Sequence, residues 1–200
     1  MKIIFATHNP GKVKEVGALL AGLNIEVVSA EEAGVIEEAV EDGKTFEENA
    51  LKKARFVAEK TGEWSMADDS GICIDALGGE PGVYSARYAG AGASAEKLIN
   101  FVLEKMKDVL EEKRPATFFT VAVLISPAGE QWAFEGKVSG RVASSPRGAP
   151  RPKLPYDVVF IPEGGSRTFA EMADEEKNRI SHRARAFLKL KDFLTEKLKR

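Results

Sequence analysis

The side chains best suited to chemistry are two adjacent carboxylates, Asp68 and Asp69, where an apolar strand meets Ser70 and Gly71. Like charges at such short range oppose joint ionisation, so a metal or a cationic group is expected beside them. Glu41 would add a third oxygen-donor side chain, and proteins hold Mg²⁺ through a few carboxylates together with water and phosphate. The alternative for these residues in isolation is an Asx-type turn that joins two strands.

A second polar group lies between the first expected strand and the first expected helix. A hydroxyl, an amide, an ammonium and the free backbone N–H groups of a helix N-terminus favour phosphate oxygens. The GxxxxGK[ST] pattern of a P-loop is absent. An ordinary strand-to-helix turn with a solvated lysine would look the same. The residues of this group are Thr7, His8, Asn9, Pro10, Gly11 and Lys12.

A third group opens the C-terminal helix. Ser181 is the expected N-cap, which places His182 and Arg183 in the first turn. Basic side chains there oppose the helix dipole, so an anion or a nucleobase acceptor would explain their position, with chance crowding as the alternative.

Other catalytic patterns are absent from the sequence. There is no GxSxG, GxGxxG or HExxH, and the two histidines are too few for a histidine-rich metal site. Cys73, the single cysteine, occupies an apolar strand position, which predicts a buried, inert thiol. One cysteine also fits a reducing compartment.

The composition favours a cytoplasmic chain without a nucleic-acid or membrane partner. The 200 residues contain 29 Lys and Arg against 31 Asp and Glu, whereas a nucleic-acid binder is usually basic. The apolar runs are too short for a membrane span, and the N-terminus becomes polar too early for a signal peptide. Acids gather over residues 31–48 and bases over 177–200, either as solvated helix faces or as separate sites for cations and anions.

Hydrophobic periodicity predicts an α/β protein with a mixed sheet, as a single domain over residues 1–200 whose two lobes flank a groove. Thr45 and Glu48 form a capping-box pattern, and Asn49 and Lys53 project together from the helix that follows. Strands are expected at 3–6, 25–28, 64–68, 71–75, 118–125, 131–137 and 158–161, and helices from about 13 to 20, 45 to 60, 95 to 113 and from 181 onward.

Taken together, several strings resemble the Ham1 family, the inosine triphosphate pyrophosphatases. Their order and spacing along nearly the whole chain carry the resemblance. They are Thr7-His8-Asn9-Pro10-Gly11-Lys12, Glu41-Asp42-Gly43-Lys44-Thr45-Phe46-Glu47-Glu48-Asn49-Ala50, Ala67-Asp68-Asp69-Ser70-Gly71, Gly78-Gly79-Glu80-Pro81-Gly82-Val83-Tyr84-Ser85-Ala86-Arg87-Tyr88, Thr168-Phe169-Ala170-Glu171-Met172, Glu176-Lys177-Asn178 and Ser181-His182-Arg183.

The resemblance implies an elongated, two-lobed α/β fold with a central mixed sheet, flanking helices and a deep cleft. It implies a homodimer that hydrolyses the noncanonical purine nucleotides XTP, ITP and dITP to the monophosphate and pyrophosphate with Mg²⁺. Such an enzyme removes these nucleotides from the nucleotide pool.

The resemblance also implies roles for individual residues. Glu41 and Asp69 would hold the metal, Asp69 would be the general base, and Asp68 and Lys53 would complete the catalytic group. Residues 7–12 would hold the triphosphate, beside Asn49 and Ser70. The remaining substrate contacts would come from Leu154, Pro155, Tyr156, Asp157, Lys177, His182 and Arg183, the last two reading the 6-keto oxygen of the base.

One string departs from the family pattern. Where the family has GFGYD, this chain has Lys153-Leu154-Pro155-Tyr156-Asp157, so Leu154 replaces the aromatic residue that would pack on the purine. Losing a stacking face costs on the order of 1 kcal/mol or more. A nucleotide-binding sensor or scaffold with weakened catalysis is therefore an alternative. Nucleic-acid binding through the basic C-terminal helix is disfavoured by the acidic balance and the 8% aromatic content.

Overall fold

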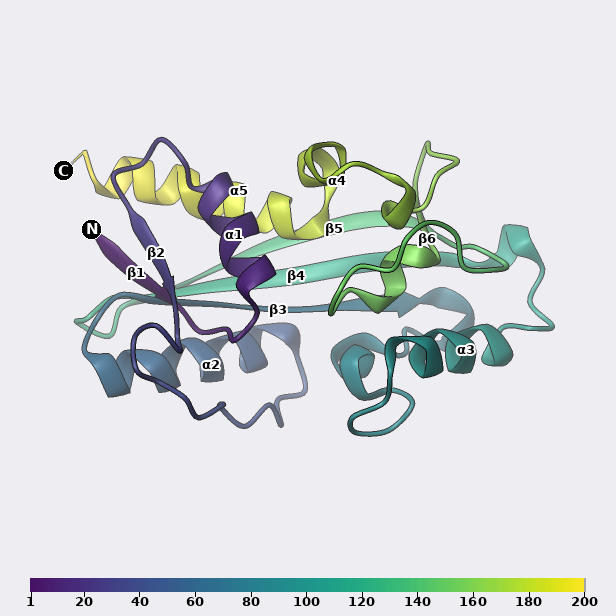
Figure 1. Ribbon diagram of the computed structural model, residues 1–200, viewed down its shortest axis with the longest axis horizontal. Helices are drawn as coiled ribbons and strands as arrows, with labels where there is room; N and C mark the ends of the chain where they lie inside the picture. The colour runs from purple at the N-terminus through teal and green to yellow at the C-terminus, as the bar shows by residue number, and fades with distance from the viewer. Residues whose placement is uncertain (200) are drawn as a thin grey trace. The chain divides into compact units, whose positions relative to one another are not determined.

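The computed structural model describes residues 1–199, so Arg200 of the basic C-terminal stretch lies outside the described residues. In this range the strands form one mixed sheet in the order β2-β1-β3-β4-β5-β6, with β1 parallel to β2 and β3 and with β5 antiparallel to β6 (Figure 1). The strands are β1 (Lys2–Phe5), β2 (Glu26–Ser29), β3 (Ser65–Ile74), β4 (Pro115–Ile125), β5 (Gln131–Val142) and β6 (Phe160–Pro162). The α-helices are α1 (Pro10–Leu19), α2 (Phe46–Thr61), α3 (Ala95–Lys105), α4 (Asp174–Ile180) and α5 (His182–Lys197). The predicted α/β fold with a mixed sheet is confirmed.

The chain divides into two compact units. Unit 1 comprises residues 1–69, 120–136 and 183–200, and unit 2 comprises residues 70–119 and 137–182. Strands β3, β4 and β5 each contribute residues to both units. The single two-lobed domain with a central cleft stays a prediction.

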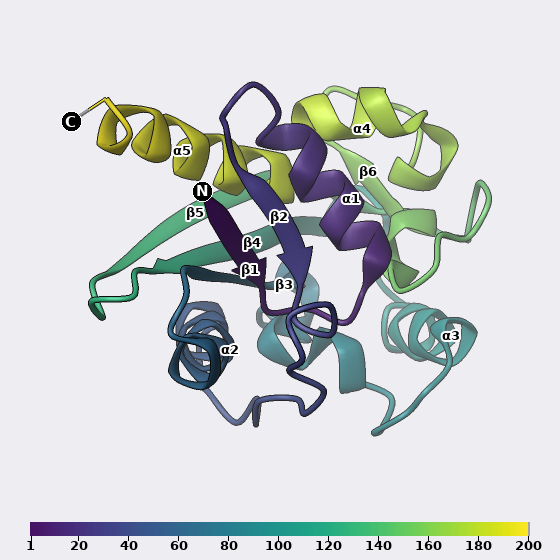
Figure 2. The ribbon, with the colours of Figure 1, turned by 60° about the vertical axis from the view of Figure 1, so that its left-hand side comes forward.

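The core of unit 1 has helices on both faces of its strands (Figure 2). On one face, Val16 of α1 and Phe187 of α5 pack with Met66 of β3. On the opposite face, Ala50 and Ala54 of α2 pack with neighbouring residues of β3 and β4. Successive residues of a strand point to opposite faces, so this strand pair is buried on both sides, which lets polar residues in β3 be surrounded by protein.

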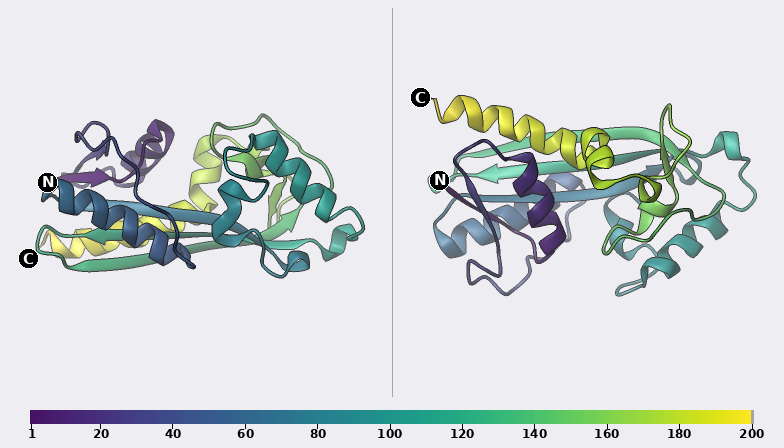
Figure 3. Two further views of the ribbon diagram at one scale, coloured as in Figure 1. Left: turned by 90° about the horizontal axis from the view of Figure 1, so that it is seen from below. Right: turned by 45° about the horizontal axis from the view of Figure 1, so that its top comes forward.

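The core of unit 2 is built around aromatic residues. Phe118 of β4 packs edge-on against Phe160 of β6, with ring centroids 4.6 Å apart. Phe169 packs against both rings, at 6.0 and 5.1 Å. Helix α3 contacts the short 3-10 helix η4 (Pro155–Val158), and Figure 3 shows α3 alongside the 150–162 segment. The positions of residues 155–172 are thus set by an aromatic core that the sequence alone does not predict.

The structure corrects three local predictions. Strand β3 runs without interruption from Ser65 to Ile74, so the Asx-turn alternative at 68–71 is wrong. The helix predicted over 95–113 ends at Lys105, and η3 (Glu111–Lys113) is a separate 3-10 turn. Cys73 is half-buried rather than enclosed, although burial still raises the pKa of its thiol.

Helix α2 begins as predicted, with one difference at its cap. The Thr45 hydroxyl accepts a hydrogen bond from the Glu48 backbone N–H at 3.1 Å. The Glu48 carboxylate accepts from the N–H of Lys44, one residue earlier than a capping box requires. The segment before α2 is therefore tied to the first turn of the helix. No helix within residues 1–199 is both long and apolar enough to cross a membrane.

Candidate functional site

The carboxylate of Asp68 is the centre of a buried ion network in unit 1. Lys12 at the start of α1 donates to Asp68 Oδ1 at 2.7 Å, and Arg183 in the first turn of α5 donates to Asp68 Oδ2 at 3.2 Å. Arg183 also pairs with Glu15 Oε2 at 3.0 Å. Asp68 and Arg183 are each 2% exposed. Both oxygens of Asp68 are therefore occupied by cations of the protein itself.

This network changes the pKa of Asp68 and of its partner Lys12. Burial by itself would raise the pKa of Asp68, but Lys12, Arg183 and Lys53 outweigh it and hold the pKa well below its ordinary value. Burial lowers the pKa of Lys12, and the positive charges of Arg183 and Lys53 act in the same direction, while Asp68 opposes them. Asp68 and Lys12 therefore each favour the charged form of the other.

Asp69 points to the other side of β3 and has different surroundings. Its Oδ1 lies 3.3 Å from Lys53 Nζ, and the same ammonium lies 3.4 Å from Glu41 Oε1. Burial raises the pKa of Asp69, with added effect from Glu41 and Asp68, although Lys53 and a hydrogen bond from Asn49 act against the rise. For Lys53, burial lowers the pKa, but Asp69, Asp68 and Glu41 outweigh it and raise the pKa. Neighbouring carboxylates thus differ sharply in proton affinity, which suits a fixed anion and a proton acceptor.

Asn49 links Asp69 to the segment that carries Glu41. Its Nδ2 donates to Asp69 Oδ2 at 3.1 Å, and its Oδ1 accepts from the N–H of Gly43 at 2.8 Å. The side chain is completely buried. A substrate contact of Asn49 stays a prediction, and the structure shows that the amide sets where Asp69 and the 41–43 segment lie.

Glu41 and Asp69 fit a magnesium site, but Asp68 does not. The two carboxylates converge on one ammonium, so a cation between them is compatible with their positions. Mg²⁺ is commonly held by one or two carboxylates plus substrate phosphates. In the described part of the chain no group of three or more His, Cys, Asp or Glu side chains is arranged to hold a metal. A third carboxylate ligand at Asp68 stays a prediction, and in the structure Asp68 pairs with Lys12 and Arg183.

The polar turn before α1 is organised by its own side chains. Asn9 is the N-cap, and its Oδ1 accepts from the Gly11 N–H at 3.0 Å. Thr7 Oγ1 accepts from the Asn9 N–H at 3.2 Å. His8 leaves the turn, with Nε2 3.2 Å from the carbonyl oxygen of Val35 and Nδ1 3.7 Å from Glu38. Pro10 occupies the first helical turn, and Lys12 is an ion-pair partner rather than a solvated lysine.

In unit 2, a second pair of opposite charges is buried. Lys177 of α4 lies 2.5 Å from Asp157 Oδ2, and the two residues are 3% and 2% exposed. The Lys177 ammonium also lies 5.5 Å from the centre of the Phe169 ring. Burying an ion pair costs desolvation free energy, which only close contact between the two charges offsets. The fold therefore keeps two charges at this place at a cost in stability.

The remaining predicted contacts of unit 2 have varied environments. Tyr156 points into the core and donates its hydroxyl to the carbonyl of Ser85 at 2.8 Å. The His182 ring stacks on Phe118 with centroids 4.5 Å apart. Leu154, Pro155 and Ser70 are half-buried. Substrate contacts of these residues stay predictions.

Two charged residues of these networks were missed from the sequence. Glu15 lies one helical turn after Lys12, and this i, i+3 spacing on α1 was the available signal. Arg151 pairs with Asp157 Oδ2 at 3.3 Å from within a proline-rich loop, where no periodicity identifies a buried partner.

The Gly43→Ala substitution tests the link through Asn49. A Cβ on Gly43 would lie 2.6 Å from Asn49 Oδ1 and 2.8 Å from Glu48 Cβ. We expect a loss of about 1–3 kcal/mol in the free energy of unfolding, measured by urea denaturation, because the contact forces the backbone to shift. Gly17→Ala is the matched control, since apart from its chain neighbours and the backbone of its own helix nothing lies within 4 Å of a Cβ there. That helical site should gain roughly 0.5–1 kcal/mol. Equal stability changes in the two variants would contradict the account.

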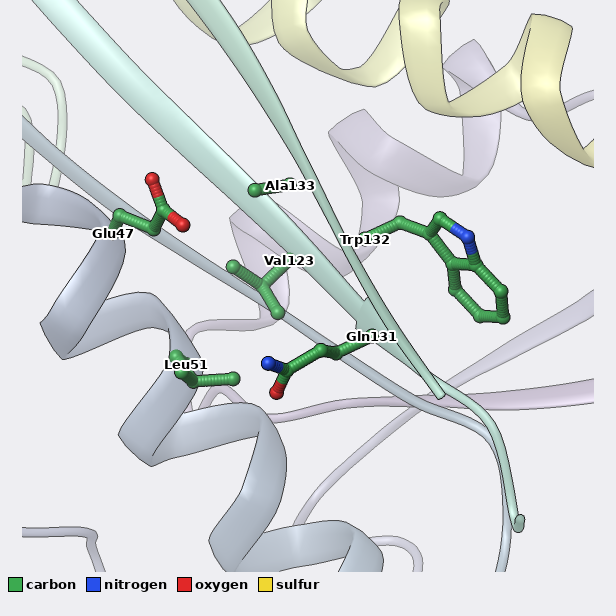
Figure 4. A pocket seen from close by; sticks show the side chains of 6 residues that line it. All are labelled: Glu47, Leu51, Val123, Gln131, Trp132 and Ala133. Atoms are coloured by element: carbon green, nitrogen blue, oxygen red, sulfur yellow. The ribbon is translucent and has the colours of Figure 1, made fainter. Parts of the chain in front are cut away.

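A hollow in unit 1 involves none of the predicted site residues. It lies between α2 and the β4–β5 hairpin and is lined by Glu47, Leu51, Val123, Gln131, Trp132 and Ala133 (Figure 4). Its lining residues are mostly apolar, with one amide from Gln131 and one carboxylate from Glu47. The charge clusters described above lie elsewhere, around Asp68 and Asp69 in unit 1 and around Asp157 in unit 2.

Comparison with known proteins shows the family to which the chain belongs. The Ham1 family profile matches residues 3–193. The chain is 45% identical over 193 residues to the dITP/XTP pyrophosphatase of Geobacter sulfurreducens and 46% identical over 191 residues to that of Bacillus subtilis, covering 96% of each chain in both cases. The Ham1 protein of Coxiella burnetii has 37% identity and a TM-score of 0.89, over 98% of this chain and 99% of that one. The Ham1 protein of Staphylococcus aureus has 34% identity and a TM-score of 0.88, over 98% of this chain and 100% of that one. The resemblance seen in the sequence is confirmed, and the chain belongs to the Ham1 family.

Proposed function

We propose that this protein hydrolyses dITP, XTP and ITP to the nucleoside monophosphate and pyrophosphate, and so removes noncanonical purine nucleotides from the pool. The observation that carries the proposal is the different surroundings of the two neighbouring carboxylates: Asp68 lies between Lys12 and Arg183, whereas Asp69 lies beside Lys53 and Asn49. The relatives in Geobacter sulfurreducens and Bacillus subtilis bear the name dITP/XTP pyrophosphatase. The names of the relatives support a hydrolase, and the surroundings of Asp69 support a carboxylate base.

Asp69 is the proposed general base. Water adds to one phosphorus of the α–β anhydride, the P–O bond to the bridging oxygen breaks, and the water proton passes to Asp69. Asn49 holds one carboxylate oxygen at 3.1 Å, which fixes the direction in which the carboxylate faces. A carboxylate with a raised pKa is a stronger proton acceptor than an ordinary one.

Lys12 and Lys53 supply positive charge for the phosphates. Asp68 keeps the Lys12 ammonium in place at 2.7 Å, while burial favours loss of its proton. Lys53 stays protonated because three carboxylates surround it. Fixed cations stabilise the charge that develops on the phosphoryl oxygens and on the leaving pyrophosphate.

Mg²⁺ is the proposed cofactor, with Glu41 and Asp69 as the side chains that would hold it. When bound, the ion would neutralise phosphate charge and polarise the scissile bond. The support is the chemistry of the donor set, two carboxylates near a single cation. The proposed setting is a homodimer in the cytoplasm, and this part rests on the family alone.

Lys177, His182 and Arg183 are proposed to act on the base side of the nucleotide. Donors that face the 6-keto oxygen of hypoxanthine or xanthine would meet another donor in adenine, leaving polar groups unpaired. Such mismatches give large discrimination.

Initial rates over ITP, dITP, XTP, ATP and GTP with Mg²⁺ test this selectivity. We expect kcat/KM for ITP, dITP and XTP to exceed that for ATP by a factor of about 100 or more. Equal rates with ATP and ITP would contradict the proposal.

The altered 153–155 loop favours a second candidate, a nucleotide-binding sensor or scaffold without turnover. ITP would then raise the melting temperature while no product forms. The cluster of Lys53, Glu41 and Asp69 speaks against it, because these side chains are the ones that hydrolysis of the nucleotide would use.

A further inference from the structure

Arg151 ties the loop that departs from the family pattern to the segment before α4. Its Nη1 donates to the carbonyl of Phe169 at 2.6 Å, and its Nη2 donates to the carbonyl of Met172 at 2.6 Å. Nη2 also lies 3.0 Å from Asp174 Oδ1, the first residue of α4. One planar guanidinium thus joins three points of a segment that leads into the helix carrying Lys177.

Arg151 shares a carboxylate oxygen with Lys177. Asp157 Oδ2 lies 3.3 Å from Arg151 Nη1 and 2.5 Å from Lys177 Nζ. The side chains of Asp157 and Lys177 are 3% and 4% exposed, and that of Arg151 is 19% exposed. The carboxylate divides its charge between two cations in surroundings with little water, where ion pairs are strong.

The backbone of the loop holds Arg151 in this position. The N–H of Leu154 donates to the Arg151 carbonyl at 3.1 Å, which closes a turn over Pro152 and Lys153. Lys153 adopts φ 59°, a conformation that favours glycine, while proline suits the position before it. A non-glycine residue in this conformation is strained and persists only where the surrounding structure holds it.

We propose that Arg151 is a positioning residue for base recognition, acting through Asp157 on Lys177. This inference rests on the proposed function, in which Lys177 meets the purine base. With Arg151 present, the charge of Asp157 is shared between two cations, so it balances only part of the charge of the Lys177 ammonium. Without Arg151, Asp157 pairs with Lys177 only, and the loop loses its attachment at Phe169 and Met172.

The role predicts a separation between base binding and phosphate binding. Arg151 lies in unit 2, whereas Lys12, Lys53 and Asp69 lie in unit 1. Substitution of Arg151 should weaken ligands that carry a hypoxanthine base and leave a ligand made of phosphates alone unaffected. If Arg151 had only a general structural role, its substitution would weaken the binding of both kinds of ligand together.

The test uses inosine monophosphate and inorganic tripolyphosphate as probes, with Kd measured by calorimetry on the full chain. For Arg151→Met we expect Kd for inosine monophosphate to rise about tenfold, the size expected for losing a charge-assisted hydrogen bond, with Kd for tripolyphosphate unchanged. Arg151→Lys keeps the charge but not the fork, so we expect a rise of about threefold. In turnover of ITP, KM should rise and kcat should stay the same.

Arg167→Gln is the matched control. Arg167 is an arginine of the same segment, 53% exposed, which pairs with Glu176 and contacts the Glu171 carbonyl but not Asp157. Its Kd values should equal those of the unaltered protein. Unchanged binding of inosine monophosphate in Arg151→Met, or equal losses for both probes, would overturn the inference. If Arg151→Met does not fold, Arg151→Lys provides the test instead, through the ratio of its Kd changes for inosine monophosphate and tripolyphosphate.

The binding readout keeps this inference separate from the proposed function. If the unaltered protein fails to hydrolyse ITP, the proposed activity fails. The ratio of the two Kd changes still supports or overturns the role of Arg151 in holding a base.

Discussion

Asp69→Asn is expected to lower kcat for ITP by about 10²–10⁴-fold, the usual contribution of a general base. The amide has nearly the same shape as the carboxylate but cannot take the water proton. Its oxygen can still accept the hydrogen bond that Asn49 now gives to Asp69. Removal of the charge also relieves repulsion from Glu41 and Asp68, so the melting temperature should not fall.

The rate of pyrophosphate release in a single turnover, with enzyme in excess over ITP, measures this effect. Asp75→Asn is the control, because Asp75 is an exposed acid just beyond the end of the same strand. It should release pyrophosphate at the rate of the unaltered protein. If Asp69→Asn kept more than about one tenth of that rate, Asp69 would not be the base.

Asp68→Asn should cost stability as well as activity. The substitution leaves the buried Arg183 and the half-buried Lys12 without the carboxylate that pairs with both. Breaking a buried ion pair on one side costs about 3–5 kcal/mol, and we expect a loss of this size at pH 7 by urea denaturation. Asp75→Asn should change stability by no more than about 0.5 kcal/mol. A free energy of unfolding equal to that of the unaltered protein would contradict the network described here.

The pH dependence of stability gives an independent check on Asp68. Its pKa is depressed in the folded state, so its stabilising effect is complete above its ordinary value of 3.8 and is lost as the pH falls below that value. The unaltered protein should therefore lose stability between about pH 4 and pH 2, and Asp68→Asn should lose less over the same interval. Denaturation curves at both pH values measure the difference, and parallel losses in the two proteins would argue against it.

Some of the fold could be predicted from local patterns. The stripe of Val13, Val16, Leu19 and Leu20 identified α1, and Thr45 identified the start of α2. Strand β3 was divided in the prediction because Asp-Asp-Ser-Gly is typical of a turn. The strand continues through these residues because cations and amides from α1, α2 and α5 satisfy the carboxylates.

The partners of the candidate site are distant in the sequence. Asp68 contacts Lys12 across 56 positions and Arg183 across 115. Residue types and the family resemblance indicated these side chains, but pairing across such separations is a property of the folded chain. For the same reason the division of roles between Asp68 and Asp69 could not be decided from their order. Successive positions of β3 place them in different surroundings.

Arg151 shows the limit of a family pattern. The replacement of a glycine-rich string by Lys153-Leu154-Pro155 was visible in the sequence and indicated only a missing aromatic. The structure adds an arginine that attaches the loop to Phe169, Met172 and Asp157. The loop that departs from the family pattern thus has contacts of its own, made by Arg151.

The measurement that tests the central claim most directly is the identity of the first products of ITP hydrolysis. Purified protein would be incubated with ITP and Mg²⁺, and the products separated by ion-exchange chromatography at early times. A base at Asp69 acting at the α–β anhydride predicts inosine monophosphate and pyrophosphate in equal amounts. Inosine diphosphate and orthophosphate as the first products would contradict it.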